Sequence, residues 1–173
     1  MLSLSDNEFS VISFLVRNFS QRLTIRNVAQ RLKFSAAGVF NILKKLEKEN
    51  VVVGEKLGTG LFYAVNFDNR IAQHLAAIVL LYSDEKFKQI DIQKFKDAKA
   101  AIFDNKTLLL ITEHGIGSDV SVPNVVVTVK SEDEFVSLLR QKDSSSLQML
   151  SSGIVLFGEE KIIEMIKKSI FRF

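Results

Sequence analysis

The sequence contains no cysteine, and Pro123 is its only proline. The missing cysteine excludes disulfide bonds, thiol catalysis and thiolate-bound metals, and it fits a reducing compartment such as the cytosol. The longest apolar run, Leu75 to Tyr82, has 8 residues, far short of the roughly 20 that span a bilayer. The sequence begins Met-Leu-Ser-Leu-Ser-Asp, without the basic stretch that starts a signal peptide, so we expect no signal peptide. We therefore expect a cytoplasmic protein that does not associate with a membrane.

The chain contains enough apolar residues for a packed core, and its charge is unevenly distributed along the sequence. Its 173 residues are 47% hydrophobic and 25% charged, which suits one ordinary domain or two small ones. Residues 1–70 carry 10 lysines and arginines against 6 acidic residues, whereas residues 71–173 carry 13 against 14. Because the excess positive charge lies in the first part, we expect a polyanionic partner there.

Three amphipathic helices are predicted in the first 50 residues. Ser5, Thr24 and Ser35 are suitable N-caps, and Glu8 completes a possible capping box with Ser5. Apolar residues follow each cap at helical spacing. The expected helices span 6–18 and 25–32, and the third begins after Ser35.

A β-hairpin is predicted directly after the third helix. Two β-rich runs, 51–53 and 61–65, enclose the sequence Gly-Glu-Lys-Leu-Gly-Thr-Gly. Glycines supply the positive φ values that a tight hairpin turn needs. We therefore expect a β-hairpin that carries Lys56 and Thr59.

The third helix has small residues at its start and lysines later. A helix that enters the major groove presents its first residues to base edges and its later basic residues to phosphates. A solvated lysine face or a protein-interaction module is the alternative, and Glu47 and Glu49 reduce the positive charge. The candidate DNA-binding residues are Arg26, Lys33, Ser35, Ala36, Ala37, Gly38, Asn41, Lys44, Lys45, Lys48, Lys56 and Thr59.

Residues 5–67 resemble the winged helix-turn-helix domains of small prokaryotic, especially archaeal, transcription regulators. The resemblance implies a recognition helix at about 35–49 and a wing at about 52–65. Ala36-Ala37-Gly38 lacks polar side chains that many relatives place there, so base readout falls to Ser35, Asn41 and the wing, or is weak. The matching segments are Leu23-Thr24-Ile25, Ala29 and Leu32, Lys33-Phe34-Ser35, Val39-Phe40-Asn41 and Leu43 to Val51.

The rest of the chain alternates between strand-like and helix-like segments. Such alternation predicts an α/β layer of about 100 residues. The expected helices are 70–82, 91–100, 132–141, a short one at 147–150, and 159–168. The expected strands are 101–103, 107–112, 125–129 and 154–157.

This second half resembles, more weakly, the nucleotidyltransferase fold of the DNA polymerase β type. The segments that carry the likeness are Val125–Lys130, Ser131–Phe135 and Ser152–Glu159. Members of that family hold Mg²⁺ and nucleotide phosphates with a Gly-Ser turn and paired carboxylates. Here Gly117-Ser118-Asp119 is followed by Ser121 where a second carboxylate is needed. We therefore expect a degenerate domain with no catalytic residues, metal or cofactor.

Together these patterns predict an α+β protein with two domains. Residues 1–69 would form a winged helix-turn-helix domain that binds double-stranded DNA. Residues 70–173 would form a nucleotidyltransferase-like domain that has lost its transferase chemistry and serves dimerisation or ligand sensing. The expected function is transcriptional regulation as a homodimer. The alternatives are a nucleotidyltransferase acting on nucleic acid or a partner protein, and an adaptor that touches no DNA.

Overall fold

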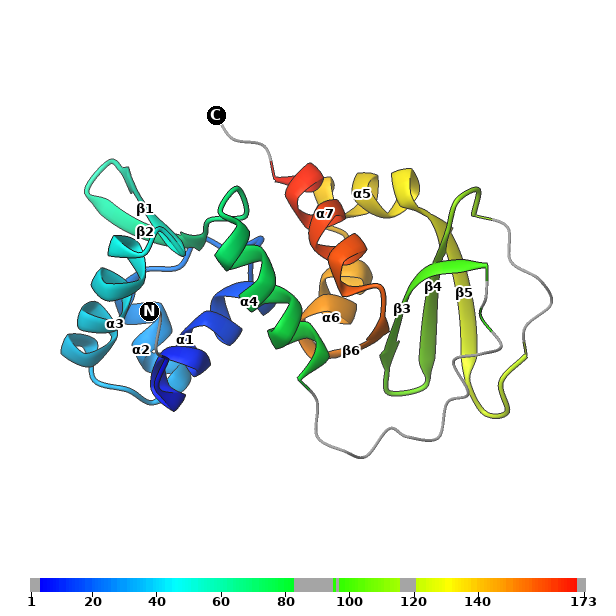
Figure 1. The fold of residues 1–173 in the computed structure, drawn as a ribbon, viewed down its shortest axis with the longest axis horizontal. Coiled ribbons are helices and arrows are strands. Elements are labelled where there is room, and N and C mark those ends of the chain that lie inside the picture. The colour runs from blue at the N-terminus through cyan, green and yellow to red at the C-terminus, as the bar shows by residue number, and fades with distance from the viewer. Residues whose placement is uncertain (1–3, 83–94, 96, 116–120, 171–173) are drawn as a thin grey trace. The chain divides into compact units, whose positions relative to one another are not determined.

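The computed structural model describes residues 4–82, 95, 97–115 and 121–170. Within these ranges the chain is α+β, with helices, a two-stranded sheet and a four-stranded sheet (Figure 1). It divides into two compact units, Met1–Val79 and Leu80–Phe173, which we call the first unit and the second unit. No helix in these ranges has the length and apolar character that crossing a membrane requires.

The helices of the first unit begin at the side chains that the sequence marks as caps. In α1 the Ser5 amide donates to Glu8 Oε2 (2.8 Å) while the Glu8 amide donates to Ser5 Oγ, so the predicted capping box is confirmed. Thr24 forms the same reciprocal pair with Asn27, which the sequence prediction had not included. The helices are α1 (Asp6–Arg17), α2 (Ile25–Leu32) and α3 (Ala36–Lys48), each within a residue of its predicted bounds.

The predicted hairpin is formed by β1 (Val52–Leu57) and β2 (Gly60–Val65), which pair antiparallel. Leu57 opposes Gly60, which leaves Gly58 and Thr59 as the connecting residues. Of the glycines expected to supply positive φ, only Gly58 does so, at +59°. The hairpin is also tied to the segment before α2, because the Tyr63 amide donates to the Leu23 carbonyl oxygen over 2.8 Å.

Helix α4 (Arg70–Leu81) belongs mainly to the first unit. The Gln73 side chain donates to the Phe67 carbonyl oxygen (2.7 Å), and Arg17 Nη2 donates to the Val79 carbonyl oxygen (3.2 Å). These bonds attach α4 to the end of the hairpin and to α1. The first unit therefore includes α4 as far as Val79.

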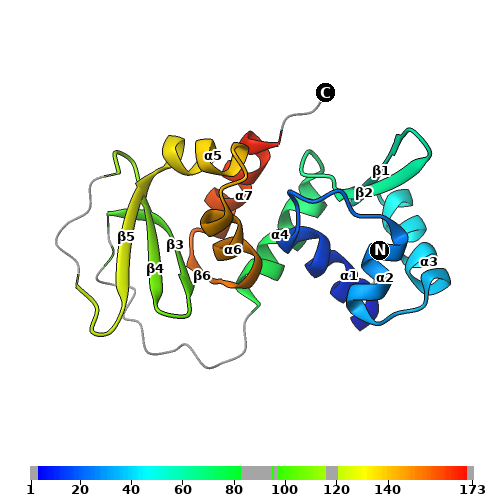
Figure 2. The same cartoon turned by 180° about the vertical axis from the view of Figure 1, so that it is seen from behind.

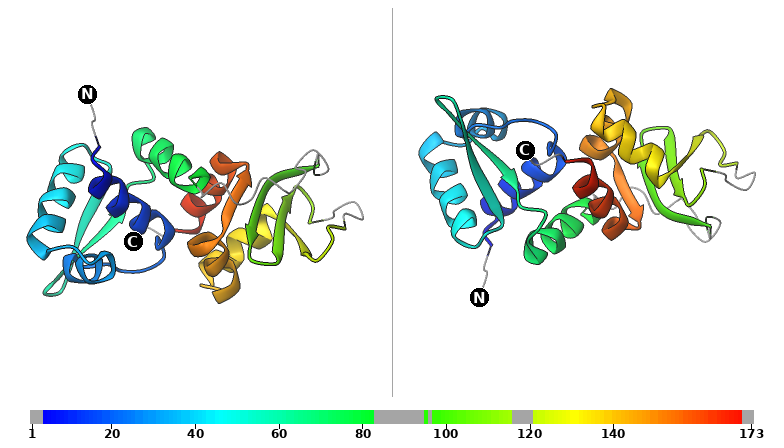
Figure 3. Two further views of the ribbon diagram at one scale, coloured as in Figure 1. Left: turned by 90° about the horizontal axis from the view of Figure 1, so that it is seen from below. Right: turned by 90° about the horizontal axis from the view of Figure 1, so that it is seen from above.

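The second unit is built on a mixed sheet of order β5-β4-β3-β6. Strand β3 pairs antiparallel with both β4 and β6, and β4 pairs parallel with β5. The helices of this unit lie on one side of the sheet (Figure 3). The strands are β3 (Ala98–Asp104), β4 (Thr107–Thr112), β5 (Val126–Ser131) and β6 (Ile154–Phe157), and the helices are α5 (Glu132–Arg140), α6 (Ser144–Ser152) and α7 (Glu159–Ser169).

Both sides of the central strands are apolar. On one side, Ala101 and Phe103 of β3 pack with Leu108 and Leu110 of β4 and with Phe95. On the other side, Ile102 approaches the end of α6, where a Cβ on Gly153 would lie 3.0 Å from its Cγ2 atom. Because these strands are covered on both sides, nearly all of their residues are apolar, and each strand appears in the sequence as a continuous hydrophobic run.

The predicted helix over 91–100 is wrong at its C-terminal end, where residues 98–100 are the start of β3. Alanine and lysine favour helix locally, but propensity is a weak determinant once tertiary pairing is possible. Here Ala98 pairs with Thr112 and Ala100 with Ile111, and Ala100 is fully buried. Most of the remaining predicted segment, residues 91–94 and 96, lies outside the described residues.

Two smaller predictions in the second unit also need correction. The short helix expected at 147–150 is longer, because Asp143 Oδ2 accepts from the Ser146 amide (2.8 Å) and starts α6 at Ser144. Ser131 caps α5, because its Oγ accepts from the Glu134 amide. Serine followed by glutamate three residues later predicts a capping box, but the Glu134 carboxylate accepts instead from Lys130 Nζ over 2.6 Å.

Gly158 is the glycine on which the packing of α7 against β3 depends. Its φ is +77°, and a Cβ there would overlap the Lys99 carbonyl oxygen and lie 2.6 Å from Ala100 Cα. We predict that Gly158→Ala lowers the free energy of unfolding by more than about 3 kcal/mol, because the left-handed backbone cost and the overlap add. Denaturant unfolding followed by circular dichroism measures the loss.

Gly58→Ala is the matched control, since Gly58 also has positive φ but nothing lies within 4 Å of its would-be Cβ. It should lose only the backbone cost, about 1–2 kcal/mol. Equal losses in the two variants would contradict a role for close packing at Gly158.

Candidate nucleic-acid interface

Helix α3 has one fully buried side and one exposed side. Val39, Leu43 and Leu46 are each 0% exposed, and their spacing places them on a single stripe against the core of the first unit. That packing fixes the rotation of the helix about its axis. The exposed residues of α3 outside this stripe are Lys45 and a further group, which we call the α3 face: Ala36, Ala37, Phe40, Asn41, Lys44 and Lys48.

The first turn of α3 presents alanines to solvent, while Ser35 and Gly38 are used within the protein. Ser35 Oγ accepts from the Gly38 amide over 3.0 Å, and a Cβ on Gly38 would lie 3.0 Å from the same oxygen. Gly38 is accordingly half-buried beside its cap. Of the predicted small residues, Ala36 and Ala37 are therefore the ones on the α3 face.

The three lysines of α3 have different surroundings. Lys44 Nζ lies 2.7 Å from Glu47 Oε2 in an ion pair at the surface, and this pairing raises the pKa of Lys44. Lys45 Nζ lies 2.7 Å from Glu8 Oε1 on α1. Lys48 is exposed, and no ion pair involving it occurs among the described residues.

The Lys45–Glu8 pair links α3 to α1. The Lys45 hydrogen bond is the main cause that lowers the pKa of the Glu8 carboxyl below its ordinary value of 4.5, against the opposing effect of burial. Only 10% of the Glu8 side chain is exposed, compared with 47% of Lys45. Lys45 therefore has a structural role in the first unit, besides any contact that it makes with a ligand.

The remaining predicted residues are exposed but come from other elements. Arg26 lies on α2, and Lys33 ends that helix in the left-handed conformation, with φ of +57°. Lys56 lies on β1 and Thr59 in the hairpin connection. The hairpin projects beyond the last turns of α3 (Figure 2), and its base meets that helix where a Cβ on Gly54 would lie 2.8 Å from Glu47 Oε1.

Phe40 is the residue of the α3 face that the sequence analysis did not select. It is 43% exposed, although large aromatic side chains are usually mostly buried. The signal was present in the spacing, because Phe40 directly follows Val39 and lies off the stripe formed by Val39, Leu43 and Leu46. A side chain at that position lies beside the buried stripe and not within it, which leaves the Phe40 ring partly exposed.

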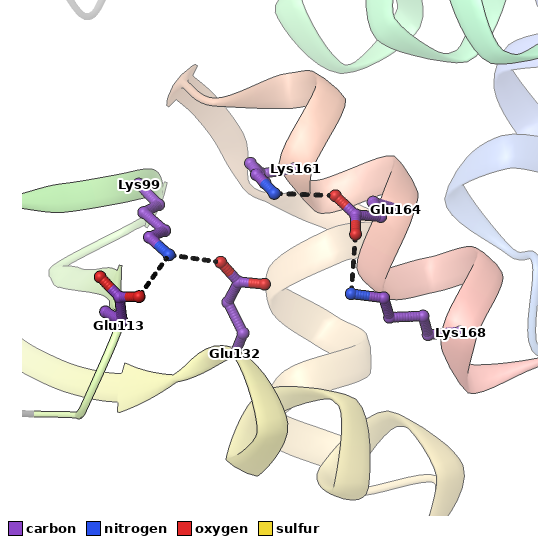
Figure 4. A network of polar contacts seen from close by, with 6 residues as sticks. All are labelled: Lys99, Glu113, Glu132, Lys161, Glu164 and Lys168. Atoms are coloured by element: carbon purple, nitrogen blue, oxygen red, sulfur yellow. Dashed lines mark hydrogen bonds and ion pairs between the residues drawn. The ribbon is translucent and has the colours of Figure 1, made fainter.

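The second unit contains a set of ion pairs on and near α7 (Figure 4). Glu164 accepts from Lys161 Nζ (2.9 Å), and its other oxygen lies 2.7 Å from Lys168 Nζ. The Lys168 hydrogen bond, followed by that of Lys161, lowers the pKa of Glu164 to about 2. The three side chains are spaced three and four residues apart along one helix, and all are substantially exposed, so they stabilise α7 only modestly.

Lys99 joins β3 to two acidic residues of the same unit (Figure 4). Its Nζ atom lies 3.3 Å from Glu132 Oε1 and 3.6 Å from Glu113 Oε1. The Glu132 oxygen is buried and makes no hydrogen bond, so the nearby charge is what offsets its burial. This arrangement connects β3 with the first residue of α5 and with the end of β4.

The residues considered for metal or phosphoryl chemistry are only partly within the described chain. Gly117, Ser118 and Asp119 lie outside it, so the nucleotidyltransferase likeness stays a prediction. Among the described residues, no three His, Cys, Asp or Glu side chains lie close enough together to hold a metal ion.

No model of a protein family matches the chain, and no curated protein matches it either.

We predict that Lys45→Ala lowers the free energy of unfolding of the protein by about 1 kcal/mol at pH 7, because Glu8 loses its charged partner. The pKa of Glu8 is depressed in the folded state, so this stabilisation is present above the unfolded-state pKa and is lost as the pH falls below 4.5 through the folded-state value. Unfolding measured in denaturant at pH 7 and near pH 3 checks both statements.

Lys48→Ala is the control for that measurement, because it removes a lysine from the same helix without breaking an observed ion pair. Its stability should match that of the unaltered protein at both pH values. A loss in Lys45→Ala that persists unchanged at low pH would argue against the pairing with Glu8.

Proposed function

We propose that the first unit is a winged helix-turn-helix domain that binds double-stranded DNA, and that the protein regulates transcription. The observation that carries the proposal is the α3 face. One side of α3 is fully buried, and the side opposite it is exposed, begins with small residues and ends with lysines. A recognition helix needs this division, because the buried side anchors it while the exposed side enters the major groove.

The arrangement around α3 supports the same proposal. Helices α2 and α3 are separated only by the segment from Lys33 to Ser35, and the hairpin follows α3 at once in the position of a wing. Lys44 and Lys48 lie on the later turns, where basic side chains meet phosphates rather than base edges. Lys56 and Thr59 on the hairpin are placed to approach the backbone of the same duplex.

The salt dependence of binding distinguishes DNA binding from the alternative that the lysines of α3 are only solvated. Each phosphate that a lysine neutralises releases counterions, so the logarithm of the association constant falls with the logarithm of the salt concentration by about one unit of slope per contact. The surface pair between Lys44 and Glu47 does not prevent such a contact, since exposed ion pairs contribute about 1 kcal/mol or less.

We predict that Lys44→Ala and Lys48→Ala each reduce the salt slope of binding to mixed-sequence duplex DNA by about one. Fluorescence anisotropy with the full chain, repeated over a series of salt concentrations, measures the slope. The two sites lie one turn apart on α3, so the double variant should lose about two.

Lys106→Ala is the matched control, because Lys106 is an exposed lysine of the second unit that the proposal leaves away from DNA. It should leave the slope unchanged. Failure of the unaltered chain to bind any duplex in a salt-dependent way would reject DNA binding, and equal effects of all three variants would reject the placement on α3.

For the second unit we propose a role in dimerisation or ligand sensing. A single DNA-binding module buries only about 600–1,000 Å² of protein surface, so useful specificity normally comes from two copies on two half-sites. The expected result is a particle with twice the mass of the chain in sedimentation equilibrium at micromolar concentration. A monomer both alone and on a duplex long enough for two half-sites would contradict this part of the proposal.

A further inference from the structure

The exposed start of α3 is apolar, which is unusual for a surface that faces a polyanion. Phe40 is 43% exposed, and Ala36 and Ala37 are exposed beside it on the preceding turn. Asn41 is the neighbouring polar residue, and Lys44 and Lys48 follow. The apolar residues therefore sit at the position of base contacts, and the charges sit at the position of phosphate contacts.

The chemistry of base edges in the major groove indicates what such a surface can recognise. Thymine is distinguished there by its methyl group, which makes apolar contacts with alanine or phenylalanine side chains. Asparagine pairs with the adenine edge, so Asn41 suits the partner base of the same type of pair. Arginine, the commonest reader of guanine, does not occur between Ala36 and Lys48.

We propose that the α3 face selects duplex DNA by apolar contact of Phe40, with Ala36 and Ala37, to thymine methyl groups. This inference rests on the proposed DNA binding and adds the class of sequence that is preferred, one rich in A·T pairs. The occupant is nucleic acid rather than an apolar protein surface, because residues 1–70 carry net positive charge and two lysines continue the same helix face.

Replacing thymine with deoxyuridine tests the contact directly, since it removes the methyl group and leaves base pairing unchanged. Tight-binding duplexes are first selected from a random-sequence pool with the full chain, and each is then remade with deoxyuridine at every thymine. We expect binding to weaken about fourfold for each contacted methyl, the effect of removing one buried methyl or methylene group.

Phe40→Ala is the protein change in a double-mutant cycle whose other change is the replacement of thymine with deoxyuridine. The variant should bind the thymine duplex more weakly than the unaltered chain does. It should also lose less affinity than the unaltered chain when thymine is replaced with deoxyuridine. Ile78→Ala is the matched control, because Ile78 is an exposed apolar residue on α4 at 51% exposure; it should respond to deoxyuridine as the unaltered chain does. Circular dichroism verifies that both variants are folded.

The outcomes separate this inference from the function on which it rests. Salt-dependent binding that is equally tight for thymine and deoxyuridine duplexes overturns methyl recognition and leaves DNA binding in place. Sensitivity to deoxyuridine that persists in full in Phe40→Ala overturns the assignment to this residue. No binding to any member of the pool rejects DNA binding itself, and methyl recognition with it.

Discussion

The burial of three residues of α3 determines what the first unit can present to a partner. Val39, Leu43 and Leu46 are completely removed from solvent, and a helix that buries such a stripe has no freedom to rotate about its axis. The exposed side is thereby set by the core and not by the exposed residues themselves. Apolar burial of about 2 kcal/mol per large side chain maintains this orientation far more strongly than the surface ion pairs of the same helix do.

A similar dependence on the core holds in the second unit, where the strands β3 and β4 are apolar on both sides. Ala100 and Ala101 are fully buried, and Gly158, the residue before α7, lies directly against the backbone of Ala100. Small side chains and a glycine permit this close approach between helix and strand. Around Lys99 the ion pairs connect β3 with α5 and with the end of β4, whereas those of Glu164 lie along α7 itself (Figure 4).

Most of the helices could be predicted because their N-caps are formed by residues close in sequence. Features that depend on pairing between residues far apart in sequence could not be predicted. Ser5, Thr24 and Ser35 start helices because their oxygens accept amide hydrogen bonds within three residues, and such signals can be read directly from the sequence. The strand at residues 98–100 depends on partners at 111 and 112, which no local pattern reveals. In the candidate interface, the link between Lys45 and Glu8 was hidden for the same reason, whereas Phe40 could have been found from its place beside the apolar stripe.

The hairpin connection has a practical consequence when it is considered together with the composition of the chain. Nothing lies within 4 Å of the position that a side chain on Gly58 would take, and Thr59 beside it is exposed. Because the natural sequence has no thiol, Thr59→Cys would create a single reactive group, to which one fluorophore or spin label could be attached at a known place. The hairpin could then be observed on its own, and its environment followed in real time as a ligand is added.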